Sequence, residues 1–319
     1  MRVAITGARG LIGRALIALL AREDNVAITA LTRNLPLDAH EYPAGIRWIR
    51  GDLNSSSDCD AVVEGQNVII HLAHTNSPLT SDRDMAGDTR LNLIPTLNLL
   101  RAVEKAGLKP HFIYPSSGGA VYGNCAERVP FAEDHACQPI NSYGIQKLAS
   151  EHYIRHSAER DHLSATVLRI ANVYGCLLSP VRWQGFIGTA LFQTLGGQPV
   201  RILGNPENIR DYVHIDDVCR AFIQCLVTRN QFDIFNIGTG IGTSVEGVLN
   251  HIEQILDRPL KRILEDYEGA VHLPPWGVLD VTKADRDLGW RARILLHEGI
   301  LKMLRDHGPR LESDRVPCE

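Results

Sequence analysis

The chain has 319 residues, about twice the length typical of one domain, which favours two domains or one large α/β unit with an added lobe. Its 33 basic and 37 acidic residues give a formal net charge of −4, so there is no positive excess to grip a nucleic-acid backbone. Hydrophobic residues at 44 % and charged residues at 22 % exclude a largely disordered, collagenous or coiled-coil chain. We therefore expect a globular protein that does not bind nucleic acid.

The strand and helix patterns alternate through the first 170 residues. Apolar runs that predict strands cover residues 3–5, 26–31, 46–50, 68–73, 111–114 and 165–170. Helical patterns cover residues 14–22, a short turn at 60–64, and residues 89–106 and 142–160. In most of these strands apolar residues do not alternate with polar ones. A parallel sheet buried on both faces requires such continuously apolar strands. The order predicts an α/β fold, a doubly wound parallel sheet with right-handed crossovers.

The composition changes after Gly175, where glycine and proline become frequent and the alternation is lost until Phe235. We predict a first domain over residues 1–174, to which segments near 210–240 and 276–284 return. A smaller, interleaved α/β lobe is predicted over residues 175–308. The polar tail, residues 309–319, is expected to fray.

The seven cysteines are scattered and never spaced C-x-x-C, which predicts free thiols rather than disulfides or a zinc site. No early apolar stretch is long enough to span a bilayer, and no signal-peptide pattern is present. We expect a soluble, cytoplasmic protein with no membrane partner. His71 and His74 flank the fourth predicted strand, but no further ligands converge on them, so no metal site is predicted and both are interpreted as packing or solvent-contact residues.

A glycine turn joins the first predicted strand to the first helix. Gly7, Gly10 and Gly13 form the pattern G-x-x-G-x-x-G. Glycines at this place let the backbone approach a pyrophosphate at the start of the helix. The position in a strand-turn-helix unit predicts a dinucleotide site, whereas the spacing alone would also fit a tight turn without ligand.

The expected acidic residue about 20 positions further on is missing. The second strand ends in Leu31-Thr32-Arg33-Asn34. Arg33, together with Arg9 of the glycine turn, is suited to a 2′-phosphate, so NADP stands beside NAD; surface arginines without a ligand are the other interpretation. Asp52, after the third strand, is placed for the adenine amino group.

Tyr143 and Lys147 lie four residues apart, on one face of a predicted helix. A nearby ammonium and the positive nicotinamide of an oxidised cofactor would lower the phenol pKa from about 10. Tyr143 would then be a base near neutral pH, and Lys147 would also hydrogen-bond the cofactor ribose. A half-buried helix pair without catalysis is the alternative.

Several motifs together resemble an extended short-chain dehydrogenase/reductase. They are the glycine turn, Asp52-Leu53, the run from Tyr114 to Gly123, the Tyr143/Lys147 pair, and the runs starting at Leu168, Arg210 and Leu279. Within that superfamily the chain is most similar to the NAD-dependent epimerase/dehydratase family, typified by UDP-glucose 4-epimerases. The resemblance runs from residue 1 to about residue 300, and it implies that the first domain is of Rossmann type.

The resemblance also implies roles for single residues. Tyr143 would be the catalytic base and Lys147 its partner, and both would contact the cofactor. Leu53, Leu72 and Ala73 would lie along the cofactor. Asn92 would sit behind the catalytic centre. Asn172 and Arg210 would contact the diphosphate of a nucleotide sugar.

Three positions depart from the family pattern. The usual catalytic Ser/Thr position falls on Gly118, so Ser117 is expected to supply the catalytic and substrate-binding hydroxyl, with Ser116 as the fallback. Ala270 stands where an arginine usually contacts the diphosphate. Arg33 stands where an NAD enzyme usually has an acid.

The resemblance favours a UDP-hexose 4-epimerase with tightly bound NAD, acting on a nucleotide sugar as a homodimer through helices 89–106 and 142–160. One alternative is an NADPH-dependent reductase of a nucleotide-linked 4-keto-6-deoxy sugar, which Arg9 and Arg33 favour. A non-catalytic dinucleotide-sensing protein on the same fold is the other.

Overall fold

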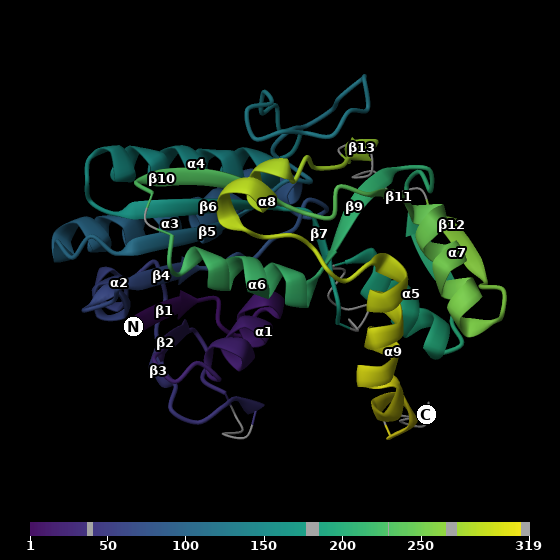
Figure 1. The fold of residues 1–319 in the computed structure, drawn as a ribbon, viewed down its shortest axis with the longest axis horizontal. Helices are drawn as coiled ribbons and strands as arrows, with labels where there is room; N and C mark the ends of the chain where they lie inside the picture. Colours follow the sequence, from purple (N-terminus) through teal and green to yellow (C-terminus); the bar gives the residue numbers. More distant parts are fainter. Residues whose placement is uncertain (37–40, 177–184, 229, 266–272, 314–319) are drawn as a thin grey trace.

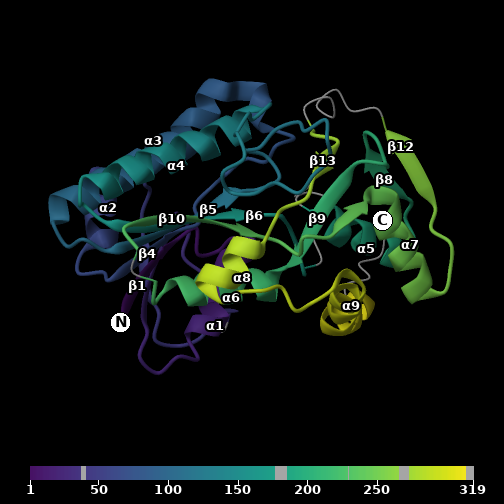
Figure 2. The same ribbon diagram turned by 45° about the horizontal axis from the view of Figure 1, so that its top comes forward.

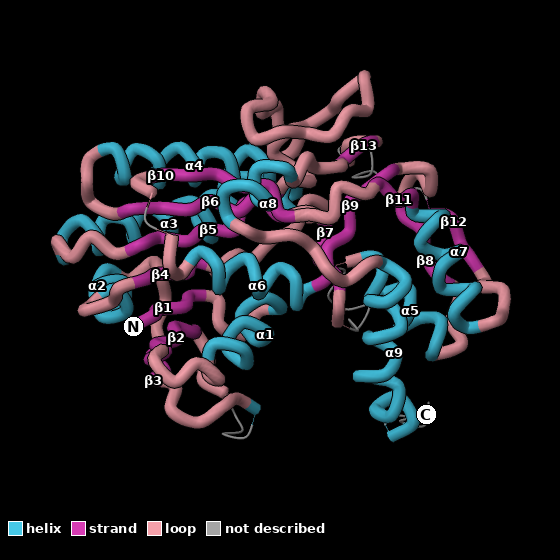
Figure 3. The backbone as a smooth tube through the Cα atoms, in the orientation of Figure 1, coloured by secondary structure: helices cyan, strands magenta, loops and turns pink. Residues whose placement is uncertain are grey.

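The computed structural model describes residues 1–36, 41–176, 185–228, 230–265 and 273–313. A large sheet with helices on both faces occupies one side of the molecule, and a smaller lobe lies beside it (Figure 1). The secondary-structure colouring in Figure 3 separates the two parts, because the strands of the large sheet gather on one side and the shorter strands of the lobe on the other.

The large sheet has seven strands in the order β3-β2-β1-β4-β5-β6-β10. Their bounds are β1 (Arg2–Thr6), β2 (Ala27–Thr32), β3 (Arg47–Arg50), β4 (Val68–His71), β5 (His111–Ser117), β6 (Ser164–Ile170) and β10 (Phe232–Ile237). Every neighbouring pair is parallel. The predicted doubly wound sheet is confirmed, and β4, with all four residues buried, shows why its run has no polar alternation.

Two helical layers cover this sheet (Figure 2). On one face α1 (Leu11–Leu20) packs against α6 (Ile215–Cys225), and α8 (Thr282–Leu288) packs on β10. On the other face α2 (Ser56–Val63), α3 (Met85–Ala106) and α4 (Ser142–Glu159) lie side by side. Each layer closes its own apolar core against the sheet.

Local sequence explains where two of these helices begin and end. Helix α3 begins four residues before its predicted start, because Asp84 accepts a hydrogen bond from the Gly87 amide at 2.8 Å. It ends, as predicted, at Gly107, whose φ of +64° favours glycine. The turn predicted at 60–64 belongs to the longer helix α2, which is capped by Ser55.

The smaller lobe is built around β9 (Ile209–His214). It pairs with three short strands: β7 (Asn172–Tyr174), β11 (Gly242–Ser244) and β13 (Trp276–Gly277). A separate pair joins β8 (Val200–Leu203) to β12 (Arg262–Glu265). The helices of the lobe are α5 (Phe186–Leu195), α7 (Val245–Leu256) and α9 (Leu296–Ser313), which share a core of their own.

The chain passes between the two parts more than once. Strand β7 leaves the end of β6 and pairs with β9, and the chain then returns to the large sheet through α6 and β10. The carboxyl ends of β5 and β6 therefore meet the lobe. Helix α9 reaches Ser313, and the rest of the predicted tail, residues 314–319, lies outside the described residues.

Candidate functional site

A cavity of about 520 Å³ lies at the carboxyl ends of β1, β2, β3 and β4. Open α/β sheets bind their ligands at this edge. Most of the residues predicted for cofactor binding line it: Gly7, Arg9, Gly10, Arg33, Asp52, Leu53, Leu72 and Ala73. The fold thus brings together segments that are up to 66 positions apart in the sequence.

The glycine turn packs too closely for any side chain at two of its three positions. Gly7 has a φ of +69°, and a Cβ there would lie 2.6 Å from the amide nitrogen of Ala73. A Cβ at Gly13 would lie 2.6 Å from the carbonyl oxygens of Gly7 and Ala8. Helix α1 then begins at Leu11, and Gly10 before it provides no side-chain cap; the first turn has no acidic residue. Its first amide groups remain available to an anion, so the turn fits a dinucleotide pyrophosphate.

The end of the cavity next to β2 and β3 carries mostly positive charge. The Arg9 guanidinium donates to the carbonyl oxygen of Asn34 at 2.9 Å, which holds it beside the end of β2. Arg33 is exposed, and the described residues include no ion-pair partner for it. Among the described residues, Asp52 is the one carboxylate in the lining, and its Oδ1 accepts from the amide and the side chain of Asn54 at 2.8 and 3.0 Å.

The Tyr143/Lys147 pair projects from α4 toward β5. Lys147 is buried, and its Nζ lies 4.8 Å from the ring centre of Tyr114 and 5.7 Å from that of Tyr143. Burial lowers the pKa of Lys147 to about 7, against a smaller raising effect of Glu151.

Tyr143 responds to burial in the opposite way. Burial raises its pKa to about 12, a hydrogen bond with Ser117 lowers it, and the charge of Asp88 raises it. This direction is opposite to the depression expected from the sequence, because burial disfavours the phenolate more than its neighbours in the protein favour it.

The backbone direction at the end of β5 determines which of its two serines contacts Tyr143. Ser117 hydrogen-bonds Tyr143, whereas the hydroxyl of Ser116 donates to the buried carboxylate of Glu151. A Cβ at Gly118 would lie 2.6 Å from Cδ1 of Leu279 and thus point into the core. A hydroxyl side chain at position 118 would therefore face away from the site.

The start of α4 is fixed by side chains that sequence reasoning missed. Within η2 (Ser81–Asp84), Asp82 accepts from the Ser142 amide at 2.7 Å, and Ser81 accepts from the Tyr143 amide at 3.1 Å. Asn141 accepts from the Gly144 amide at 2.9 Å. Three amides at the start of α4 are thus satisfied, and the backbone of Tyr143 is held in place.

Asp88 of α3 is a second group that sequence reasoning missed. Its buried carboxylate accepts from Asn76 at 2.7 Å, Asn92 at 2.6 Å, Ser142 at 3.1 Å and Gln146 at 2.5 Å. It thereby joins α3 to α4 and to the loop after β4. Its position four residues before Asn92, on the same helical face, is a signal that could have indicated it.

The predicted diphosphate residues lie near the boundary with the lobe. Asn172 donates to the carbonyl oxygen of Asp211 at 3.2 Å and lies close to Gly119, beside the end of β5. The Arg210 guanidinium donates to the Ile209 carbonyl oxygen at 2.8 Å, and burial lowers its pKa. No carboxylate pairs with Arg210 among the residues described, which leaves a cation for an anionic ligand. Ala270 lies outside the described residues.

The chain is similar to known proteins over nearly its whole length. Residues 3–238 match the family model described as NAD dependent epimerase/dehydratase family. The chain belongs to this family.

Individual members agree with that assignment. The chain is 31 % identical to a dTDP-4-dehydro-6-deoxyglucose reductase of Escherichia coli, covering 95 % of this chain and 96 % of that protein. It is 30 % identical to a UDP-glucose 4-epimerase of Mycolicibacterium smegmatis, covering 95 % and 97 %. The solved structure of the Thermotoga maritima UDP-glucose 4-epimerase with UDP-glucose superposes with a TM-score of 0.88 at 30 % identity, covering 97 % of this chain and 99 % of that one.

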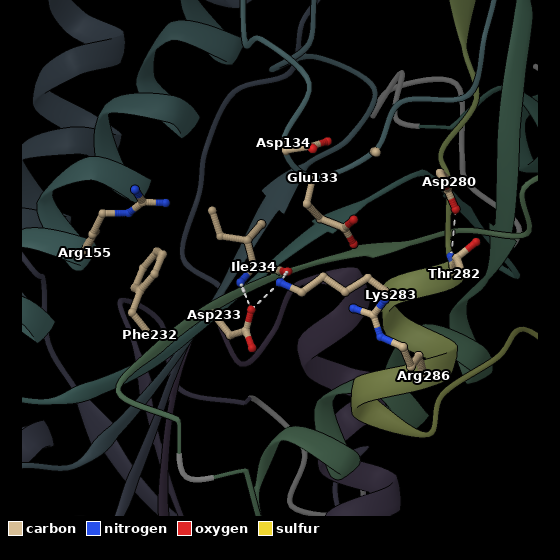
Figure 4. Close-up of a pocket in the computed structure, with 11 residues that line it drawn as sticks. Glu133, Asp134, Arg155, Phe232, Asp233, Ile234, Asp280, Thr282, Lys283 and Arg286 are labelled. Carbon is tan, nitrogen blue, oxygen red and sulfur yellow. Dashed lines mark hydrogen bonds and ion pairs between the residues drawn. The ribbon is translucent and has the colours of Figure 1, made fainter.

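A second cavity of this family member, about 610 Å³, lies at the outer edge of β10 beside α8 (Figure 4). Several of its charged side chains already have partners: Lys283 donates to the Ile234 carbonyl oxygen at 2.8 Å and forms an ion pair with Asp233, and Asp280 accepts from the Thr282 amide. It contains none of the predicted site residues. The glycine-turn cavity is therefore the candidate site of the epimerase/dehydratase chain.

Two features are absent from the described part of the chain. No group of three or more histidine, cysteine, aspartate or glutamate side chains is placed to hold a metal ion there. Likewise, no helix among the described residues is long and apolar enough to cross a membrane.

Proposed function

We propose that this protein is a UDP-hexose 4-epimerase that works with bound NAD. The observation that carries the proposal is that Ser117, Tyr143 and Lys147 lie together at the end of β5, next to the glycine-turn cavity. Similarity to 4-epimerases over the whole chain supports this activity.

The residues present fit NAD along the cavity. The glycine turn and the free start of α1 would hold the pyrophosphate, Asp52 the adenine amino group, and Leu72 and Ala73 the length of the cofactor. NAD, when bound, supplies reversible hydride acceptance at C4 of the sugar.

The side chains of the protein handle the proton and the diphosphate. Burial alone keeps Tyr143 protonated, and the positive charges of Lys147 and of an oxidised nicotinamide would favour its phenolate. In that form the Tyr143 Oη takes the proton of the C4 hydroxyl and returns it after the configuration has been inverted, so no net redox change results. Ser117 holds the Tyr143 hydroxyl and the sugar hydroxyl in one hydrogen-bonded group. Arg210 and Asn172 retain the diphosphate, which lets the sugar turn without leaving.

The test is conversion of UDP-glucose to UDP-galactose by the purified protein without added cofactor. Tyr143→Phe should lower the rate by about 10²- to 10⁴-fold, the usual size of a lost acid–base group. Tyr153→Phe, a change at an exposed tyrosine of the same helix, is the matched control and should keep the rate. A wild-type protein that converts no UDP-hexose would contradict the proposal.

One observation favours the NADPH-dependent reductase of a nucleotide-linked 4-keto-6-deoxy sugar as a second candidate. Arg9 and Arg33 surround the end of β2, and the described residues of the cavity lining include no acid there. Separate titrations with NAD and NADP decide between them, since a strong preference for NADP favours the reductase. Retention of Tyr143 and Lys147 argues against a non-catalytic dinucleotide-sensing protein.

We also propose a homodimer and a cytoplasmic location. Helices α3 and α4 lie side by side (Figure 2) and expose large apolar side chains, among them Ile94, Ile145 and Tyr153. Such side chains on neighbouring helices are typical of a subunit interface. Six of the cysteines are free thiols, which is typical of a reducing compartment.

A further inference from the structure

The two histidines around the end of β4 differ in how their ring nitrogens are satisfied. His71 is buried with both nitrogens hydrogen-bonded, Nδ1 to Oγ1 of Thr6 at 2.7 Å and Nε2 to Oγ1 of Thr96 at 3.0 Å. It therefore joins β4 to β1 and α3, as the sequence-based interpretation of a packing residue has it.

His74 lies three residues further on and lines the glycine-turn cavity. Its ring meets the edge of the Tyr143 ring, with the centres 4.9 Å apart and the planes at 89°. Its Nε2 is buried, and among the described residues no atom hydrogen-bonds it. Burial and the nearby charge of Lys147 lower the pKa of His74 well below its usual value, so the ring is neutral.

The backbone on both sides of His74 is held firmly. The Ala73 amide donates to Oγ1 of Thr6 at 3.3 Å, and the Thr75 amide donates to Oδ1 of Asn92 at 2.8 Å. These bonds fix the backbone at His74 beside the cavity, and the ring itself contacts Tyr143 edge-on. A buried polar atom without a partner is rare in folded proteins. Because the residue that carries this atom also lines the cavity, a ligand atom bound there is the candidate partner.

The strand order shows which part of a dinucleotide His74 would meet. Asp52 and Arg33 mark the end of the cavity near β2 and β3, whereas β4 lies between β1 and the strand β5 that carries Ser117. His74 therefore stands at the reacting end, next to Tyr143. We propose that Nε2 of His74 hydrogen-bonds the nicotinamide riboside half of the bound dinucleotide and orients it beside Tyr143, an inference that rests on the proposed function.

The experiment compares the binding of NAD and of ADP by calorimetry, using protein freed of nucleotide with charcoal. ADP shares the adenosine and diphosphate contacts of NAD but lacks the nicotinamide riboside. His74→Leu should weaken NAD binding about tenfold, the usual effect of one hydrogen bond, and leave ADP binding within about twofold. His74→Gln, whose side-chain amide replaces the lost nitrogen, should recover most of the NAD affinity.

Three results would overturn the inference. They are unchanged NAD binding by His74→Leu, an equal loss of ADP and NAD binding, and a loss in His74→Gln as large as that in His74→Leu. Binding of ADP by the leucine variant also reports that the cavity is folded. A wild-type protein that binds ADP but not NAD would instead contradict the proposed function, so the two failures can be told apart.

Discussion

Lys147 Nζ donates a hydrogen bond to the carbonyl oxygen of Pro115, 2.8 Å away. Because Lys147 shares a helix with Tyr143 and Pro115 shares a strand with Ser117, this one contact ties the two proposed proton-handling residues together. The ammonium is buried to make it, and its pKa falls to about 7 as a result.

This pKa gives a stability prediction with a defined sign. An unfolded lysine has a pKa of about 10.4, so between pH 7 and 10 the unfolded chain holds a proton at Lys147 that the folded chain has lost. Raising the pH through this window therefore favours the folded state. The free energy of unfolding of the wild type, minus that of Lys147→Met, should rise by more than about 2 kcal/mol, since each pKa unit is worth about 1.4 kcal/mol.

Urea unfolding of both proteins at a series of pH values measures this difference and cancels the other titrating groups. Lys105→Met is the control, because Lys105 is exposed and pairs with Asp60 at the surface. Its difference from the wild type should stay flat over the same window. A flat difference for Lys147→Met as well would show that the ammonium is not buried in solution.

A second prediction separates Ser117 from Gly118. Ser117→Ala removes the hydroxyl that hydrogen-bonds Tyr143 and should lower the epimerase rate roughly 10- to 100-fold. Gly118→Ala should destabilise the fold by about 1–3 kcal/mol, because its Cβ would press on the buried Leu279. The double variant Ser117→Ala/Gly118→Ser should not recover the rate. Recovery would show that position 118 faces the substrate after all.

The sequence predicted the parts of the site that depend on local pattern. Buried strand runs specify the parallel sheet, the glycines mark the turn before α1, and the four-residue spacing places Tyr143 and Lys147 on one helical face. These features could be predicted because each one depends on residues that are close together in the sequence.

The rest depends on contacts between distant segments. Ser81 and Asp82 hold the start of α4 from about 60 positions earlier, in a short helical turn without periodic pattern. The choice between Ser117 and Gly118 depends on the backbone direction at the end of β5, which residue spacing does not record. That no described residue hydrogen-bonds Nε2 of His74 can be seen only when the positions of its neighbours in the fold are known.

A third prediction concerns the cation in the lobe. Arg210→Met should weaken UDP binding roughly 10- to 100-fold, because a charge-assisted contact to the diphosphate is lost. NAD binding should be unchanged, and the free energy of unfolding should not fall, since burial of the guanidinium already lowers its pKa. Calorimetry with UDP measures the effect, and Arg201→Met, at an exposed pair with Glu265, is the control. Equal UDP affinity in Arg210→Met and the wild type would place the diphosphate elsewhere.

The last prediction tests the proposed dimer through one exposed side chain of α4. Ile145 is 53 % exposed, so Ile145→Asp should not disturb the fold of the subunit. At a subunit interface, however, the new carboxylate would be buried without a partner, which is strongly unfavourable. Leu264→Asp on β12 is the matched control, because Leu264 is 64 % exposed and lies in the other lobe. We expect sedimentation to show a dimer for the wild type and for Leu264→Asp, and a monomer for Ile145→Asp. A monomeric wild type, or a dimer that survives Ile145→Asp, would mean that α3 and α4 present their apolar side chains to something other than a second copy of the chain.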